Sequence, residues 1–168
     1  MAHGVRLAFE AELDAKLREY AIWVTKGAPG TAIIKLGEGL LMCNQPGARA
    51  GMRDQFVEEI KLVVTPTVLS AATTEIVRKW TRAEHIISIG TKFEWEELVL
   101  LLTLRIEVEL ALNVLVLFGI ESKKFDLAHW DEELRKLGLF RENRSAFLSA
   151  IRTVRKNWGV PIEDRWSP

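Results

Sequence analysis

Two groups of basic residues have the side-chain types and spacing that bind phosphate. In the first group, Arg49 and Arg53 lie beside small residues at the start of an expected helix. Glycine lets a backbone approach a ligand closely, and helix N-termini favour anions. The second group is Arg152, Arg155 and Lys156, which share one helical surface. An ordinary solvated loop and a basic helix C-terminus are the structural alternatives for these two groups.

Only three short arrangements suggest acid–base or metal chemistry. They are Glu84-His85, Asp126-x-x-His129 and Glu94-x-Glu96-Glu97. A dinuclear carboxylate bundle needs Glu-x-x-His on two helices, and the sequence contains no such pattern. The single cysteine, Cys43, is most simply a small buried apolar residue. We therefore predict no catalytic residue, no metal site and no cofactor, and we expect that the protein is not an enzyme.

Arg78 and His85 are separated by six residues on an expected helix. This spacing resembles the Arg-x(4–6)-His motif of HEPN-domain ribonucleases, which are also small helical proteins. In that family the two residues meet across a dimer to cleave RNA, so the resemblance implies a ribonuclease that uses Arg78 and His85. Lys79 stands where the family usually has Asn, Asp or His. A solvated arginine and a partly buried histidine are the structural alternative.

Six tryptophans are spread over the expected helices and the C-terminal tail. They are Trp23, Trp80, Trp95, Trp130, Trp158 and Trp166. Tryptophan is enriched at protein–protein interfaces, and six in a small helical chain suggest more apolar surface than one core absorbs. We predict that these residues lie at interfaces between subunits, with a tryptophan-rich core as the alternative.

Apolar residues at steps of three and four predict helices along most of the chain. These helices cover residues 5–26, 52–64, 66–89, 127–137 and 142–158, and a further long helix ends at Gly119. Thr91-Lys-Phe-Glu94 forms a capping box that would begin the long helix. The alternation over 103–110 is a strand pattern, but the absence of turn signals favours a helix there. Residues 31–43 fit either a short strand or a broken helix, because Gly37 and Gly39 weaken a helix.

These elements predict an all-α fold, a single-domain helical bundle of five to six helices with a looser N-terminal region. Within this domain of residues 1–168, we expect an N-terminal helical arm with loops over 1–64 and an apolar helical bundle over 65–168. The most apolar stretch, residues 98–118, is long enough to span a membrane. It carries Arg105, Glu107 and Glu109 near its middle, so we expect a buried or interfacial helix and no transmembrane segment.

Composition excludes several classes of protein. The chain has 168 residues, 48% of them apolar, so it is not disordered and can form a real core. One cysteine excludes an intramolecular disulfide framework. The 23 basic and 23 acidic residues give zero net charge, which argues against coating nucleic acid by bulk charge alone. The six amide side chains and many charged ones are a hyperthermophile tendency.

Charge is nevertheless unevenly distributed along the chain. Residues 26–53 hold four basic side chains against one acid, and residues 141–158 hold five against one. Residues 91–137 hold ten acids against six bases. An acidic middle flanked by two basic segments could meet phosphate with one face and other copies of the chain with another face.

Taken together, the chain resembles the helical major capsid proteins of archaeal filamentous viruses. The shared features are a small all-helical domain, a basic N-terminal half interrupted by Gly and Pro, an apolar helical C-terminal half and few amides. The resemblance implies subunits, often paired with a related subunit, that wrap double-stranded DNA and pack into a helical filament in the virion. The basic positions in the matching N-terminal half are Lys26, Lys35, Arg49 and Arg53. Zero net charge is a departure from the family, because it leaves only local faces for DNA.

Our leading hypothesis is a non-enzymatic assembly subunit that packages double-stranded DNA through backbone contacts. Its predicted nucleic-acid-binding residues are Lys26, Lys35, Arg49, Arg53, Arg152, Arg155 and Lys156. Its expected partners are copies of itself or a related subunit and DNA, and its expected location is the virion, otherwise the cytoplasm. The alternatives are the ribonuclease described above and a helical small subunit of an RNA-guided effector complex.

Overall fold

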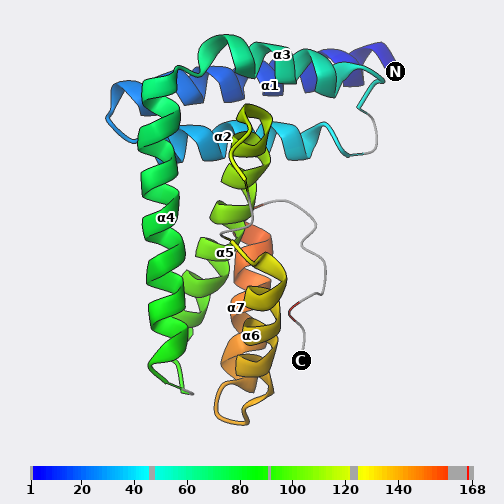
Figure 1. Cartoon of the computed structure of the whole chain (residues 1–168). Coiled ribbons are helices and arrows are strands. Elements are labelled where there is room, and N and C mark those ends of the chain that lie inside the picture. Colours follow the sequence, from blue (N-terminus) through cyan, green and yellow to red (C-terminus); the bar gives the residue numbers. More distant parts are fainter. Residues whose placement is uncertain (1, 46–47, 91, 122–124, 159–165, 167–168) are drawn as a thin grey trace. The chain divides into compact units, whose positions relative to one another are not determined.

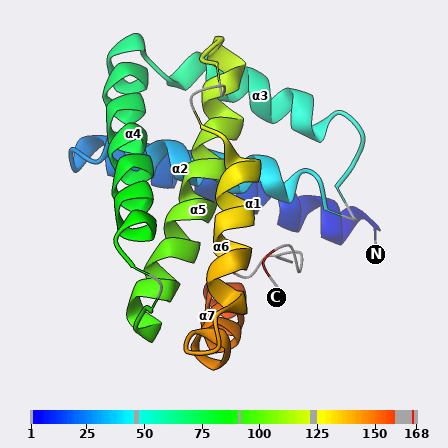
Figure 2. The ribbon, with the colours of Figure 1, turned by 60° about the horizontal axis from the view of Figure 1, so that its bottom comes forward.

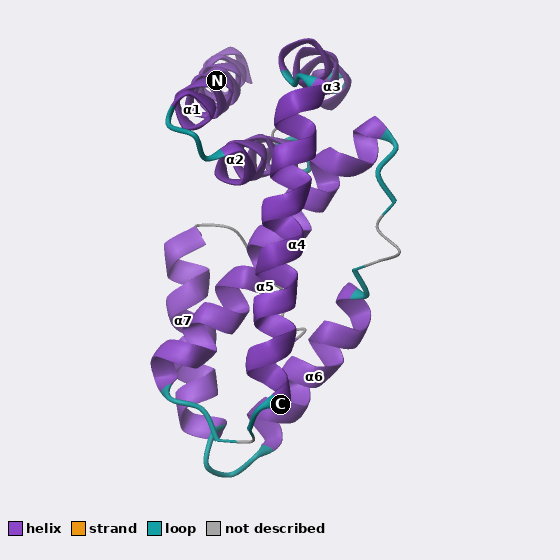
Figure 3. Cartoon of the chain, turned by 60° about the vertical axis from the view of Figure 1, so that its left-hand side comes forward, coloured by secondary structure: helices purple, strands orange, loops and turns teal. Residues whose placement is uncertain are grey.

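All regular secondary structure is helical in the computed structural model, within the part of the chain that the structure describes (Figures 1 and 3). The described residues are 2–45, 48–90, 92–121, 125–158 and 166, with side chains from residue 9 onward. The helices are α1 (Ala2–Thr25), α2 (Pro29–Met42), α3 (Met52–Val63), α4 (Pro66–Ser88), α5 (Trp95–Leu115), α6 (Leu127–Leu139) and α7 (Arg144–Trp158). A short 3₁₀ turn, Val116–Phe118, follows α5. The predicted all-α class is confirmed, with seven α-helices in the described chain instead of five to six, because 29–42 is a full helix.

The chain divides into two compact units. Unit 1 comprises Met1–Arg78 and Val108–Ser122, and unit 2 comprises Lys79–Glu107 and Lys123–Pro168. The chain therefore passes from one unit to the other within α4 and again within α5. The division that we expected after residue 64 lies inside unit 1, because parts of α4 and α5 belong to that unit.

Local signals set most helix ends where the sequence predicts them. The Thr65 hydroxyl accepts a hydrogen bond from the Val68 N–H (3.2 Å) at the start of α4. The Asp126 carboxylate accepts one from the His129 N–H (2.9 Å) at the start of α6. Gly119 adopts a φ of 78°, the left-handed conformation that ends the α5 segment without strain.

The start of α5 differs from the predicted capping box. The helix begins at Trp95, and Thr91 lies outside the described residues. The Glu94 N–H donates to the Glu97 carboxylate (3.0 Å), so Glu97 is the side chain that reaches back at this helix start. The helix therefore begins three residues later than the capping box predicts. Glu97 is three residues after Glu94, the same spacing that separates Glu94 from Thr91.

Unit 1 is built around α1, α2 and α3, which Figure 3 shows nearly end-on. The Lys16 ammonium of α1 reaches the Glu38 carboxylate of α2 (2.6 Å). Desolvation opposes the charge of Lys16, but Glu38 and Glu19 outweigh it and raise the pKa of the ammonium. The buried face of α2 includes Gly37, whose missing side chain lets the helix approach the backbone of Leu110 in α5.

Unit 2 contains an antiparallel hairpin of α6 and α7 (Figure 2). Gly138 in α6 faces the ring of the buried Phe147 in α7, at a distance that leaves no room for a side chain. The fully buried Asn143 holds two turns together. Its Oδ1 accepts from the Phe93 N–H (2.9 Å), and its Nδ2 donates to the Leu137 carbonyl (3.2 Å).

Candidate nucleic-acid interface

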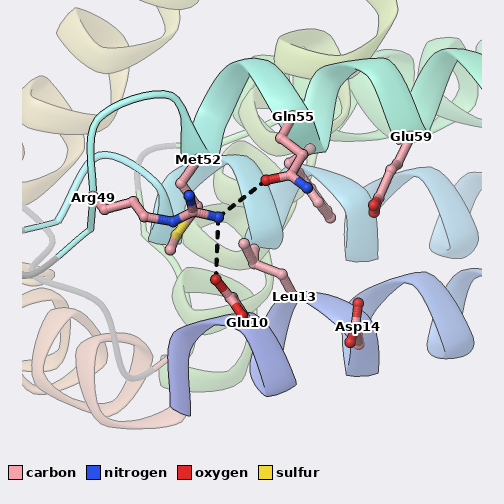
Figure 4. A pocket seen from close by; sticks show the side chains of 8 residues that line it. Glu10, Leu13, Asp14, Arg49, Met52, Gln55 and Glu59 are labelled. Atoms are coloured by element: carbon pink, nitrogen blue, oxygen red, sulfur yellow. Dashed lines mark hydrogen bonds and ion pairs between the residues drawn. The ribbon is translucent and has the colours of Figure 1, made fainter. Parts of the chain in front are cut away.

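Arg49 lies in a pocket of unit 1 between α1 and α3, shown in Figure 4. Its guanidinium donates to the Glu10 carboxylate (3.1 Å) and to the Gln55 amide oxygen (3.1 Å). Asp14 and Glu59 also line the pocket, so three carboxylates surround one cation. Three carboxylates disfavour phosphate in this pocket, and Arg49 already pairs with Glu10, although both side chains are exposed.

The other basic residues predicted in unit 1 do not gather into one site. The Lys26 ammonium lies over the Trp23 ring, 4.9 Å from its centroid, which is a cation–π contact. Lys35 pairs with Glu38 (3.5 Å) and is half-buried. Arg53 is exposed beside the start of α3. The structure therefore does not bring Lys26, Lys35, Arg49 and Arg53 together as a phosphate-binding surface.

Helix α7 carries the clearest cationic surface. Its sequence, Arg144–Trp158, contains four basic residues and no carboxylate. Arg144, Arg152 and Lys156 are exposed and have no carboxylate partner within the described part of the chain. Arg155 is half-buried and engaged by other groups of the chain. The stripe of Arg144, Arg152 and Lys156, which we call the α7 stripe, thus includes two of the three residues predicted there.

Arg144 was not among the predicted site residues, although the sequence contains a signal for it. Cations stabilise a helix at its C-terminal end and oppose the dipole at its N-terminal end. Arg152 and Lys156 have this structural explanation, whereas Arg144 is the first residue of α7 and gains nothing from it. A basic residue at a helix start is therefore more informative than one at the helix end.

The structure divides the tryptophans between interior and surface. Trp80, Trp130 and Trp166 are each buried to at least nine-tenths, which corrects their expected placement at a subunit interface. Trp80 and Trp130 pack edge-to-face on each other, with centroids 4.7 Å apart, and the Trp166 indole N–H donates to Asp131 (2.6 Å). These large aromatic side chains fill the space between α4 and α6, so they belong to the core. Trp23 and Trp158 are partly exposed, and Trp95 is exposed.

One end of unit 2 exposes large apolar side chains that the sequence analysis missed. Ile89 (67% exposed) and Trp95 (37%) flank the turn between α4 and α5. Leu139 (61%) ends α6, and Phe140 (42%) begins the turn between α6 and α7. Figure 1 shows both turns at the same end, and the Asn143 hydrogen bonds join them. We call these four residues the apolar end. Hydrophobic periodicity along the helices does not predict their exposure, because they lie at helix ends and in turns.

The residues considered for catalysis remain separate in the structure. Arg78 and His85 are both exposed on α4, as a site completed by a second subunit would require. Burial raises the pKa of the Cys43 thiol, although Arg53 opposes that shift, so the thiol is a weak nucleophile at neutral pH. Among the described residues, no three His, Cys, Asp or Glu side chains are arranged to hold a metal ion.

None of the described helices is by itself both long enough and apolar enough to cross a membrane. Helices α3 and α4 reach that length and apolarity only together, and they are bent by 103° at the break between them.

Comparison of the chain with protein-family models, with curated proteins and with solved structures gave no match.

Proposed function

We propose that this protein is a non-enzymatic assembly subunit that binds the backbone of double-stranded DNA through the α7 stripe. In this proposal, copies of the chain associate through the apolar end. The outline resemblance to helical capsid proteins of archaeal filamentous viruses supplies the biological setting, a nucleoprotein filament within a virion. Backbone contacts position a protein on DNA without reading its sequence, as a packaging function requires.

The α7 stripe is the observation that carries this proposal. Arg152 and Lys156 are four residues apart on the side opposite the buried Phe147, Ile151 and Val154, and Arg144 extends the row to the start of the helix. At a rise of about 1.5 Å per residue, the three cations cover about 18 Å of helix axis, enough to meet successive phosphates. No carboxylate lies in α7, and none of the three cations has a carboxylate partner among the described residues, which supports binding of an external anion.

The apolar end supports association between copies. Four large apolar side chains are exposed at this one end of unit 2, whereas the exposed apolar residues that are ordinary on soluble proteins are scattered singly. Exposed side chains of both signs lie near these residues in the chain. They are basic Lys92, Lys136 and Arg141 and acidic Glu94, Glu96 and Glu142. A two-fold contact can place acids of one copy opposite bases of the other, because the same patch meets itself.

Removal of the α7 stripe is expected to weaken DNA binding and its salt dependence. In the triple variant Arg144→Gln, Arg152→Gln, Lys156→Gln, the slope of log Kobs against log salt should fall in magnitude by about 3, one for each lost phosphate contact. Titration of a labelled duplex at several salt concentrations, followed by fluorescence anisotropy, measures this slope.

The matched control removes the same charge from exposed positions elsewhere, with Arg18→Gln, Lys61→Gln and Arg82→Gln. Equal weakening by both triple variants would show that only net charge matters and would refute the role of the α7 stripe. Failure of the unaltered protein to bind a duplex at low salt would refute DNA binding itself. RNA cleavage that is lost in His85→Ala would instead establish the ribonuclease hypothesis.

Charge placed in the apolar end is expected to prevent association. The double variant Ile89→Glu, Leu139→Glu should sediment as a monomer at concentrations where the unaltered protein forms dimers or larger assemblies, because like charges would face each other in a dry contact. Leu62→Glu is the control, since Leu62 is an apolar residue of unit 1 that is 84% exposed. If the double variant assembles as the unaltered protein does, the contact lies elsewhere.

A further inference from the structure

We propose that a second pocket, in unit 2, binds an organic cation of the alkylated ammonium class. The pocket lies between α4 and α6 and has a volume of about 270 Å³. Trp80 and Ile87 from α4 and Trp130 from α6 supply its apolar wall, and Glu84 and Glu133 supply carboxylates. This inference is independent of the proposed function, because it uses none of the residues of the α7 stripe or of the apolar end.

The two indoles form a rigid aromatic corner. Their planes meet at 81° with ring centroids 4.7 Å apart, and the Phe125 ring packs on Trp80 at 90° and 5.3 Å from the other direction. All three aromatic residues are buried to at least nine-tenths, so the neighbouring side chains hold the rings in place. Trp80 and Trp130 both line the pocket, and indole is the side chain that attracts quaternary and methylated ammonium groups most strongly.

The charged side chains that line the pocket favour a cation over an anion. The titratable side chains in the lining are Glu84, Glu133 and His129, and neither Lys nor Arg is among them. Glu133 also pairs with Lys136 (3.3 Å), but that lysine lies outside the pocket lining and its side chain is 58% exposed. Two carboxylates beside an apolar wall disfavour anions by repulsion and leave neutral ligands without a charge partner.

The apolar wall selects the kind of cation. Although Glu84, His129 and Glu133 line the pocket, no three His, Cys, Asp or Glu side chains among the described residues are arranged to hold a metal ion. The methyl groups of an alkylated ammonium ion remove apolar surface from water against the same wall, while its charge remains close to the carboxylates and the ring faces. An organic cation therefore uses both halves of the pocket, and no other simple ligand class does.

Choline and its neutral isostere 3,3-dimethylbutan-1-ol test this proposal, because they share one shape and differ in charge. Binding to the full chain is measured at about pH 8 by titration calorimetry and by the indole N–H signals in NMR spectra. We expect choline to bind at least about tenfold more tightly than the neutral alcohol. We also expect Glu84→Gln with Glu133→Gln to weaken choline binding by at least about fivefold.

Glu132→Gln is the matched control, because Glu132 is an exposed acid of the same helix that pairs with Arg135 outside the pocket. It should leave choline binding unchanged. Equal affinity for choline and the neutral alcohol would overturn the proposal and leave an apolar pocket only. Unchanged choline binding in the double Gln variant, or no binding up to about 20 mM choline, would also overturn it. The altered residues are surface carboxylates, so the variants retain the core.

Discussion

Replacement of Asp131 by alanine is expected to lower the free energy of unfolding by about 3–5 kcal/mol. Asp131 accepts two hydrogen bonds from Arg105, from Nε and from Nη2, each 2.8 Å long. The Arg105 side chain is only 2% exposed. Without the carboxylate, a buried guanidinium loses its two-point charge partner, and the Trp166 N–H loses its acceptor as well. Urea unfolding followed by circular dichroism measures the change.

Two further variants test whether the loss of stability comes from the Arg105–Asp131 ion pair. Glu132→Ala removes a neighbouring exposed acid of α6 and should change stability by less than about 0.5 kcal/mol. Arg105→Met with Asp131→Leu replaces the pair with apolar side chains and should recover most of the loss, since buried pairs gain little over good apolar packing. If Asp131→Ala is as stable as Glu132→Ala, the pair contributes nothing to the fold.

Replacement of Gly37 by alanine is expected to destabilise unit 1 by about 3 kcal/mol or more. A Cβ atom at residue 37 would lie 2.7 Å from the carbonyl carbon of Leu110 and closer still to its oxygen. Because those atoms belong to the backbone of α5, no side-chain rotation relieves the clash, and the two helices must move apart. Thermal and urea unfolding of the variant measure the loss.

Two other glycines act as controls for this prediction. Gly39→Ala meets the ring of Phe56 (2.5 Å), a side chain that can shift, so its loss should be smaller than that of Gly37→Ala. Gly90→Ala meets nothing closer than 3.9 Å and should change stability by less than about 0.5 kcal/mol. A Gly37→Ala protein as stable as Gly90→Ala would mean that α2 and α5 do not pack this closely.

The glycines of α2 show how local propensity and tertiary packing can conflict. Gly37 and Gly39 lower helix propensity, so the sequence left residues 31–43 open between a strand and a broken helix. The structure resolves this segment as a helix whose small residues face α3 and α5 at close range. The two glycines lower the intrinsic helix propensity of α2. The close packing of α2 on α3 and α5, which exists only in the folded chain, offsets this loss.

The candidate nucleic-acid interface also separates what local sequence predicts from what tertiary packing decides. Sequence spacing identified two basic segments, but charge density does not say which cations are already paired. Glu10 lies 39 residues before Arg49 and neutralises it, whereas nothing in α7 neutralises the α7 stripe. The tryptophans follow the same rule, because Trp80 meets Trp130 only when α4 and α6 are brought together.

By itself, the sequence determined the helical class, most helix boundaries and the uneven distribution of charge. These features depend on signals within about four residues of each other, such as Thr65 with Val68 or Asp126 with His129. Only the tertiary structure decided the burial of Arg105 against Asp131, the loss of Arg49 to an acidic pocket, the apolar end and the aromatic corner. Each of these depends on residues that are far apart in the chain, and hydrophobic periodicity does not specify which buried faces meet.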